Sequence, residues 1–343
     1  MSTESIAQPN TDFLRYSHSI GICVMEGRGF MFPVDTALGK DGRMHTVSRA
    51  WVNASSNLRV TMYDIESEYY GVYGEFGEGL GEFRWPAGMA VDSQGNVYMS
   101  DEQTQRINIY SGDGSAISHW GVFGDQDGQF DRPSGIDFDP EDNLYVSDSM
   151  NNRIQKFSKD GNFQATFEIQ AGETNKLNRP WGVTFAPDRC VYVADWGNDR
   201  ICKFTEQGTF VRSFGKRGRG DGEFRNPSSV AVDSDGYIYV ADWANERIQV
   251  LDRNGDFVAK YRGEATVSKW AQEFLDSNVE EAEPRSRSNL EPDPHMFGGD
   301  PHEESAHIEK YFWGPTSIKI DRAGRIFVTE SNRHRIQIYE RNG

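Results

Sequence analysis

The stretch YVADWGNDRI (residues 192–201) holds the side chains that most readily suggest chemistry. Asp195 and Asp199 lie four residues apart, and Arg200 follows directly. Two carboxylates at close range can act as a general acid and base, and an arginine can hold an anionic substrate beside them. The same side chains can instead stabilise a turn, because Asp bonds to nearby backbone groups. The surrounding sequence has to decide between these two interpretations.

An internal repeat contains this stretch. Similar segments of about 25 residues start at prolines spaced 47 residues apart: Pro86, Pro133, Pro180 and Pro227. A fifth segment starts at Pro315 after a longer gap, and a degenerate one starts at Pro33. The repeat therefore occurs six times along the chain.

Each segment predicts short strands separated by turns. In PSSVAVDSDGYIYVADWANERIQVL, from Pro227, the apolar runs are SVAV, YIYVA and RIQVL, and DSDG is a turn signal. An aromatic-containing run such as FVAKY follows and predicts a fourth strand. Four strands per unit, repeated six times, predict an all-β, six-bladed β-propeller that occupies residues 1–343 as a single domain. The last copy ends after its third strand, so we expect a strand at about residues 17–26 to complete that blade and close the ring.

The pattern Pro-x-Gly, then Asp, Gly-x-x-Tyr-Val-x-Asp-x-x-Asn-x-Arg-Ile-Gln, resembles the NHL repeat. The connecting segments FGKRGRGDGEFRNP and WGVFGDQDGQFDRP fit the same family. The resemblance covers about residues 16–263 and 313–343. It implies a six-bladed propeller that serves as a binding platform for protein or RNA, and related six-bladed propellers include lyases and hydrolases.

The polar residues of the opening stretch recur from copy to copy, which indicates architecture rather than chemistry. The aspartate recurs as Asp101, Asp148, Asp195 and Asp242, and the arginine recurs five residues later as Arg106, Arg153, Arg200 and Arg247. Asp and Asn favour turns, and an arginine can bridge a turn to its neighbour. We therefore interpret these residues as a structural corner.

Tryptophan residues, in contrast, break the repeat. Trp196 and Trp243 follow the repeated aspartate, where other copies carry Glu102, Ser149, Ser331 or Arg49. The loop at this point and the segment around each proline open on one face of a propeller. The candidate binding residues on this face are Trp85, Trp181, Trp196, Trp243, Trp313, Arg132 and Arg179. Exposed aromatic and arginine side chains are typical of interfaces and ligand pockets.

Catalytic signatures are missing from the sequence. Related lyases carry metal-binding histidines directly after the repeat proline, but these positions hold Val34, Ala87, Ser134, Trp181, Ser228 and Thr316. Asp35 is the only carboxylate beside a repeat proline. There is no G-x-S-x-G elbow and no phosphate-binding loop. We expect no catalytic residues and no cofactor.

Residues 264–312 depart from the repeat and form an insert between blades five and six. SKWAQEFLDSNVEEAE predicts a short amphipathic helix with Ser268 as its N-cap, and we add Trp270 and Phe274 to the candidate binding residues. The following Pro- and Gly-rich segment predicts a loop, and the insert is expected to lie over the tryptophan face as a lid or arm. His295, His302 and His307 are weak metal candidates, because their spacing differs from that of a helical zinc pair.

The composition limits the partners. The chain of 343 residues has 53 Asp and Glu against 36 Lys and Arg, a net charge of −17, which disfavours nucleic acid. No signal peptide and no membrane-spanning run are recognisable, and the three cysteines do not suggest a disulfide framework, so we expect a cytoplasmic protein.

The sequence thus favours a non-catalytic interaction propeller, a peripheral or scaffold subunit that binds another protein through its Trp/Arg-rich face and acidic insert. Association with a membrane through such a partner stays open. One alternative is a lyase or hydrolase with a pocket under the insert, and another is a propeller that binds a small molecule.

Overall fold

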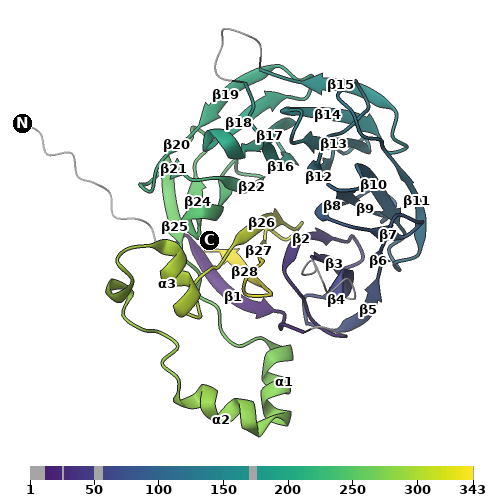
Figure 1. Ribbon diagram of the computed structural model, residues 1–343. Coiled ribbons are helices and arrows are strands. Elements are labelled where there is room, and N and C mark those ends of the chain that lie inside the picture. Colours follow the sequence, from purple (N-terminus) through teal and green to yellow (C-terminus); the bar gives the residue numbers. More distant parts are fainter. Residues whose placement is uncertain (1–11, 25–26, 50–56, 170–175, 343) are drawn as a thin grey trace, which may run out of the picture.

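The computed structural model describes residues 12–24, 27–49, 57–169 and 176–342. Six four-stranded antiparallel sheets stand around a central axis and form a six-bladed β-propeller, as predicted (Figure 1). The strands of one blade are hydrogen-bonded in sequence order from the axis outward, except in blade six. Their inner strands begin with the repeat prolines, at one end of the axis.

The blades have the following strands. Blade one contains β2 (Pro33–Leu38), β3 (Arg43–Ser48), β4 (Arg59–Asp64) and β5 (Tyr69–Tyr73). Blade two contains β8 (Pro86–Val91), β9 (Val97–Asp101), β10 (Arg106–Tyr110) and β11 (Ala116–Trp120). Blade three contains β12 (Pro133–Phe138), β13 (Asn143–Asp148), β14 (Arg153–Ser158) and β15 (Phe163–Phe167). Blade four contains β16 (Pro180–Phe185), β17 (Cys190–Asp195), β18 (Arg200–Thr205) and β19 (Phe210–Phe214). Blade five contains β22 (Pro227–Val232), β23 (Ile238–Asp242), β24 (Arg247–Leu251) and β25 (Phe257–Tyr261). Blade six contains β26 (Pro315–Ile320), β27 (Ile326–Glu330), β28 (Arg335–Arg341) and β1 (Leu14–Ile20).

The N-terminal strand closes the ring. β1 pairs antiparallel with β28 and supplies the outer strand of blade six, which confirms the predicted closure. The predicted bounds of about 17–26 were wrong, because the strand covers Leu14–Ile20. The residues that follow form a linker instead, in which Cys23 makes a single bridge to Phe30.

The linkers between blades share one buried anchor. Three residues before each repeat proline lies an apolar side chain that is at most 3% exposed: Phe30, Phe83, Phe130, Leu177, Phe224 and Phe312. In most linkers a glycine with positive φ lies nine residues before this anchor. At Gly74 (φ 82°), for example, a Cβ atom would lie 2.3 Å from the Phe83 ring. The anchors fill the space between neighbouring blades, where much of the core lies.

The repeated polar residues form the predicted corner. Asp242 is fully buried and accepts hydrogen bonds from the Arg225 backbone N–H (2.7 Å), Asn245 Nδ2 (2.9 Å) and Arg247 Nε (2.7 Å). Arg247 then donates to the linker carbonyls of residues 219, 220 and 223. The opening stretch repeats this arrangement, since Arg200 Nε donates to Asp195 Oδ2 at 2.7 Å. Asp195 also accepts the Asn178 N–H at 2.7 Å and so holds the linker against its blade, as the structural interpretation expects.

The insert contains more helix than predicted. α1 (Lys269–Ser277) has Ser268 as its N-cap, as expected, with Ser268 Oγ accepting from the Ala271 N–H. The chain then continues through α2 (Val279–Arg287), which begins inside the predicted helical segment and runs into the predicted loop. The 3-10 turn η4 (Pro294–Phe297) and α3 (Pro301–His307) follow where a loop was predicted. None of these helices has the length and apolar run needed to cross a bilayer.

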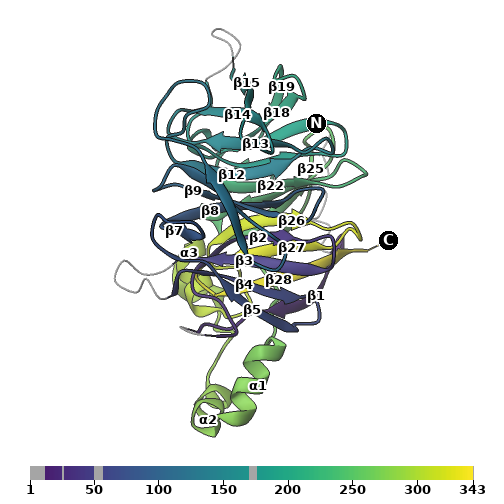
Figure 2. The same ribbon diagram turned by 90° about the vertical axis from the view of Figure 1, so that its right-hand side faces the viewer.

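The prediction that the insert lies over the tryptophan face is also wrong for most of the insert. α1 and α2 lie beside the ring, beyond the outer strands, rather than over its open end (Figures 1 and 2). The cause is Trp270, which is 1% exposed and packs between Phe30 and Tyr63 while its Nε1 donates to the Ser67 carbonyl. Only α3 reaches the end of the ring that carries the tryptophans, where it contacts the turn after β23.

Candidate binding site on the ring axis

Two short 3-10 turns position the central tryptophans. η2 (Trp196–Asn198) follows β17, and η3 (Trp243–Asn245) follows β23 in the next blade. Each turn ends on a residue in the left-handed conformation, Asp199 (φ 56°) or Glu246 (φ 50°). Because the chain reverses there, the first residue of each turn extends from the end of the blade. Trp243 is accordingly 40% exposed, and Trp196 is half-buried.

Three of the predicted tryptophans meet in one cavity. Trp181, Trp196 and Trp243 line a hollow of about 280 Å³ at the end of the axis, which we call the tryptophan cavity. Its remaining lining consists of Val34, Arg49, Ser228, Thr316, Ser331 and Asn332. No carboxylate is among these residues, and Ser228, Thr316, Ser331 and Asn332 contribute hydroxyl and amide groups.

Arg49 forms one wall of the tryptophan cavity. Its Nη2 donates to Glu102 Oε1 at 2.7 Å, and its Nε donates to the Pro86 carbonyl at 2.8 Å. The guanidinium carbon lies 4.8 Å from the Trp85 ring centre and 5.9 Å from that of Trp181. Burial lowers the pKa of Arg49, and the nearby Glu102 carboxylate opposes this shift. Arg49 thus connects blade one with blade four across the axis.

The other predicted site residues lie outside the cavity. Trp85 is half-buried beneath Arg49, and Trp313 lies near α3, with its Nε1 3.4 Å from His302 Nε2. Arg132 and Arg179 are exposed residues of the turns before their repeat prolines. Trp270 belongs to α1 and is buried between this helix and the ring, and Phe274 is 44% exposed beside the ring.

The three insert histidines do not converge on one point. His302 Nδ1 lies 2.8 Å from Glu246 Oε1. His307 stacks on Phe297, with ring centres 4.6 Å apart, and His295 belongs to η4. Among the described residues, no group of three potential metal ligands includes any of them.

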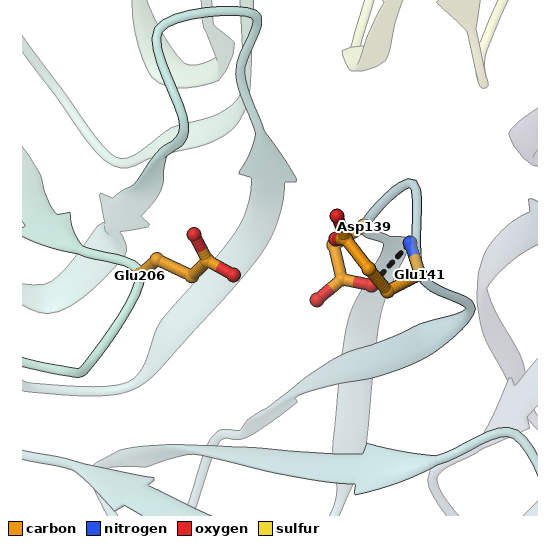
Figure 3. A group of neighbouring side chains, drawn as sticks. All are labelled: Asp139, Glu141 and Glu206. Atoms are coloured by element: carbon orange, nitrogen blue, oxygen red, sulfur yellow. Dashed lines mark hydrogen bonds between the residues drawn. The ribbon is translucent and has the colours of Figure 1, made fainter.

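One acidic cluster does bring three potential ligands together. Asp139, Glu141 and Glu206 face one another between two neighbouring blades (Figure 3). Arg189 Nη2 lies 3.1 Å from Glu141 Oε1 and 2.9 Å from Glu206 Oε1, and Lys156 Nζ lies 3.0 Å from Asp139. Burial alone would raise the pKa of Asp139, but hydrogen bonds from Asn143 and Lys156 lower it. The protein's own cations therefore compensate this cluster.

Charged side chains also lie on the inner strands of three blades. Lys319 Nζ lies 3.5 Å from Asp35 Oδ2 and donates to the Met89 carbonyl at 3.3 Å. Asp137 accepts the Phe185 N–H at 2.9 Å, and burial raises its pKa, while Lys319 opposes this shift. The three side chains come from three different blades. Asp137 and Lys319 also line a hollow formed by β12, β16, β22 and β26 and the residues that follow them.

Sequence reasoning missed Arg49, Asp137 and Lys319 as residues of the axis. Arg49 offered a signal, because it occupies the same repeat slot as Trp196 and Trp243. Asp137 and Lys319 share another slot, four residues after the repeat proline, where Ala37, Ala90 and Ala231 stand in other blades. A comparison of that slot between copies would have found both charges.

Comparisons with known proteins agree with this architecture. The NHL repeat model matches residues 130–157 and 312–339, and a family model described as a 6-bladed beta-propeller matches residues 169–272. The chain is thus a six-bladed β-propeller built from NHL repeats. A search of curated protein sequences found no match.

Solved structures share the fold at low identity. A protein of unknown function from Bacteroides thetaiotaomicron is 20% identical, with a TM-score of 0.59 over 91% of this chain and 70% of that one. An inactive virginiamycin B lyase from Staphylococcus aureus with quinupristin is 12% identical, with a TM-score of 0.57 over 95% and 99%. A gluconolactonase from Xanthomonas campestris is 13% identical, with a TM-score of 0.57 over 97% and 96%. At such identity these likenesses establish the fold alone.

Proposed function

We propose that this propeller is a non-catalytic binding protein that takes an apolar or aromatic side chain of a partner protein into the tryptophan cavity. The observation that carries the proposal is the meeting of Trp181, Trp196 and Trp243 at the axis, with Trp243 40% exposed. Tryptophan is enriched among the few residues that dominate interface energies, and such residues cluster near the centre of an interface.

The size of the cavity favours a single side chain. Pockets for drug-sized ligands measure about 300–1,000 Å³, whereas the tryptophan cavity holds about 280 Å³. One aromatic or branched side chain on a partner loop matches this space. The surrounding rim, with exposed Arg132 and Arg179, would contact the rest of the loop.

The chemistry of the lining favours binding over catalysis. Hydroxyl and amide groups of Ser228, Thr316 and Asn332 can orient a ligand, but the described residues of the lining offer no pair of acid and base groups. Arg49 is committed to Glu102, the Pro86 carbonyl and two indole rings. Because the described part of the wall contains no carboxylate, an uncharged anchor side chain suits the site better than a cationic one.

Selection from a displayed library of random peptides tests the proposal without knowledge of the partner. We expect enriched peptides to share one apolar or aromatic anchor and to bind the purified protein in titration calorimetry. The double variant Trp196→Ala, Trp243→Ala should weaken binding by about 2 kcal/mol or more, roughly 30-fold. Phe123→Ala is a matched control, because Phe123 is 69% exposed on a linker outside the cavity. Selected peptides that bind the double variant as tightly as the unmodified protein would contradict the proposal.

A further inference from the structure

A second hollow lies between the insert and blade six, away from the tryptophan cavity. It holds about 360 Å³ and is lined by the segment after β1, by α1 and by the beginning of β28. We call it the insert cleft. Part of its wall is the segment from Gly21 to Val24, and part is α1, which Trp270 fixes to the ring. The cleft therefore exists only in the presence of the insert.

One part of the lining is apolar. Ile22, Val24, Val267, Phe274 and Leu275 contribute aliphatic and aromatic surface. Phe274 is 44% exposed and Val267 is 36% exposed, although both lie in a concave region. Exposed apolar side chains scattered over a surface need no explanation, but a group of them that lines a hollow is typical of a ligand site.

The other part of the lining is cationic. Arg285, Arg333 and Arg335 line the cleft together with Glu309, the one carboxylate among the lining residues that the structure describes. Arg285 is paired with Glu309 at 2.7 Å, and Arg335 Nε is paired with Glu330 at 2.8 Å. In a chain with a net charge of −17, three arginines beside one hollow are unusual.

Arg333 carries the uncompensated charge. Its Nη2 donates to backbone carbonyls of α3 and the residue after it, those of Ser305 (2.7 Å), Ala306 (3.2 Å) and Ile308 (3.3 Å). Among the described residues, no carboxylate forms an ion pair with it, and its buried Nε has no hydrogen-bond partner. Burial and the neighbouring Arg335 lower the pKa of Arg333, and Glu330 and Glu309 oppose this shift without forming an ion pair with it. An anion in the cleft would supply the missing charge.

We propose that the insert cleft binds a small amphipathic anion, a molecule with a carboxylate head and an unbranched apolar body, with the head toward the arginines and the body along α1. Guanidinium groups are well suited to carboxylates, and an apolar body would cover Phe274 and Val267. This site is independent of the tryptophan cavity, so either proposal can fail without the other.

Titration calorimetry with decanoate tests the head and the body together. Decanoate should bind with one-to-one stoichiometry. Decanol, which has the same body without the charge, should bind at least about tenfold more weakly, and decyltrimethylammonium should bind more weakly still. Equal affinities for decanoate and decanol, or no measurable decanoate binding, would overturn the proposal.

Two variants locate the site. Phe274→Ser should weaken decanoate binding about tenfold, because it removes apolar surface from the cleft. Glu309→Gln should strengthen it severalfold, because it removes the one carboxylate of the described lining. Met296→Ser is the matched control, since Met296 is 75% exposed on the same insert but does not line the cleft. Unchanged affinity in Phe274→Ser would place the bound decanoate elsewhere and refute the site.

Cys23 provides an independent readout. It is an exposed thiol that lines the cleft, whereas Cys202 is buried and Cys190 is half-buried. In a Cys190→Ser background, decanoate should slow the reaction of Cys23 with a disulfide reagent such as 5,5′-dithiobis(2-nitrobenzoate). The protection should follow the calorimetric affinity. Reaction at an unchanged rate with decanoate bound would contradict occupancy of this cleft.

Discussion

His334 Nδ1 accepts a hydrogen bond of 2.9 Å from the backbone N–H of Phe32, 302 residues earlier in the chain. This bond joins blade six to the linker of blade one, at the seam where the ring closes. Polar side chains do the same at other blade junctions: Gln105 accepts from the Arg132 N–H, and Asn152 accepts from the Arg179 N–H. Among these three acceptors, only the one at the seam is an ionisable side chain.

The seam bond predicts acid sensitivity. Burial, reinforced by Arg333, lowers the pKa of His334 from 6.5 to about 4. Because the folded pKa lies below the unfolded one, this contribution to stability is complete above about pH 6.5 and is lost as the pH falls toward 4. The free energy of unfolding, measured in urea, should fall by up to about 3 kcal/mol over that range because of this group.

His334→Asn isolates this effect. Asn occupies the equivalent slot in blade three, accepts the same kind of bond and tolerates the left-handed backbone of residue 334 (φ 54°). Its free energy of unfolding should change less between pH 6.5 and 4 than that of the unmodified protein. His45, whose pKa is also lowered to about 4, contributes equally in both proteins and cancels. Identical pH profiles would exclude His334 as a source of acid sensitivity.

The Arg49–Glu102 pair should behave as a coupled unit. Arg49→Met leaves the Glu102 carboxylate, whose side chain is 11% exposed, without its partner, and should destabilise the fold by about 3 kcal/mol in urea unfolding. The double variant Arg49→Met, Glu102→Gln removes both charges and should recover at least about 1 kcal/mol. Additive losses in the double-mutant cycle would show that the pair is not coupled.

Substitution of a corner aspartate should reduce the stability of the fold more than most other substitutions. Asp242→Ala removes acceptors for Arg225, Asn245 and Arg247 and leaves a buried guanidinium, so we expect a loss of about 3–5 kcal/mol. Asp252→Ala, in an outer turn of the same blade, should cost about 1 kcal/mol, because it loses only local turn bonds. Equal costs measured by chemical unfolding would refute the role of Asp242 in the corner.

Trp270 should control the position of α1. Trp270→Ala removes the side chain that packs against Phe30 and Tyr63, and should cost about 3–5 kcal/mol or release α1 from the ring. Hydrogen exchange should become faster across residues 269–287 while β23 and β24 stay protected. Phe274→Ala is the control, because its side chain is 44% exposed. Unchanged exchange in α1 would contradict this anchoring role.

The repeat made most of the fold predictable. Each blade carries the same turn residues and strand pattern, so five clear copies support a weak sixth. The predicted bounds of the N-terminal strand were wrong, because the end of that segment belongs to a linker. Gly21, Phe30 and Pro33 have the same spacing as Gly74, Phe83 and Pro86 in the linker before blade two. An apolar run that includes Cys23 looked like a strand, although the linker spacing already assigned it otherwise.

The sites were less predictable than the fold. The loop positions placed Trp181, Trp196 and Trp243 on one end of the ring, but only packing brings their rings around one cavity. Arg49 reaches Trp181 across the axis, a contact that a blade-by-blade comparison does not contain. Likewise, one side chain, Trp270, decides where the insert lies, and nothing local in the sequence names its partners.

The pairing of β1 with β28 has a consequence for the order in which the molecule is completed. β1 is synthesised before the other strands of the ring and must remain unpaired until β28 emerges, more than 300 residues later. At about 5–20 residues per second, this interval lasts tens of seconds, during which five blades can assemble beside an open end. The nascent chain therefore exposes the edge of β1 for longer than the edges of the strands that pair with their neighbours in sequence.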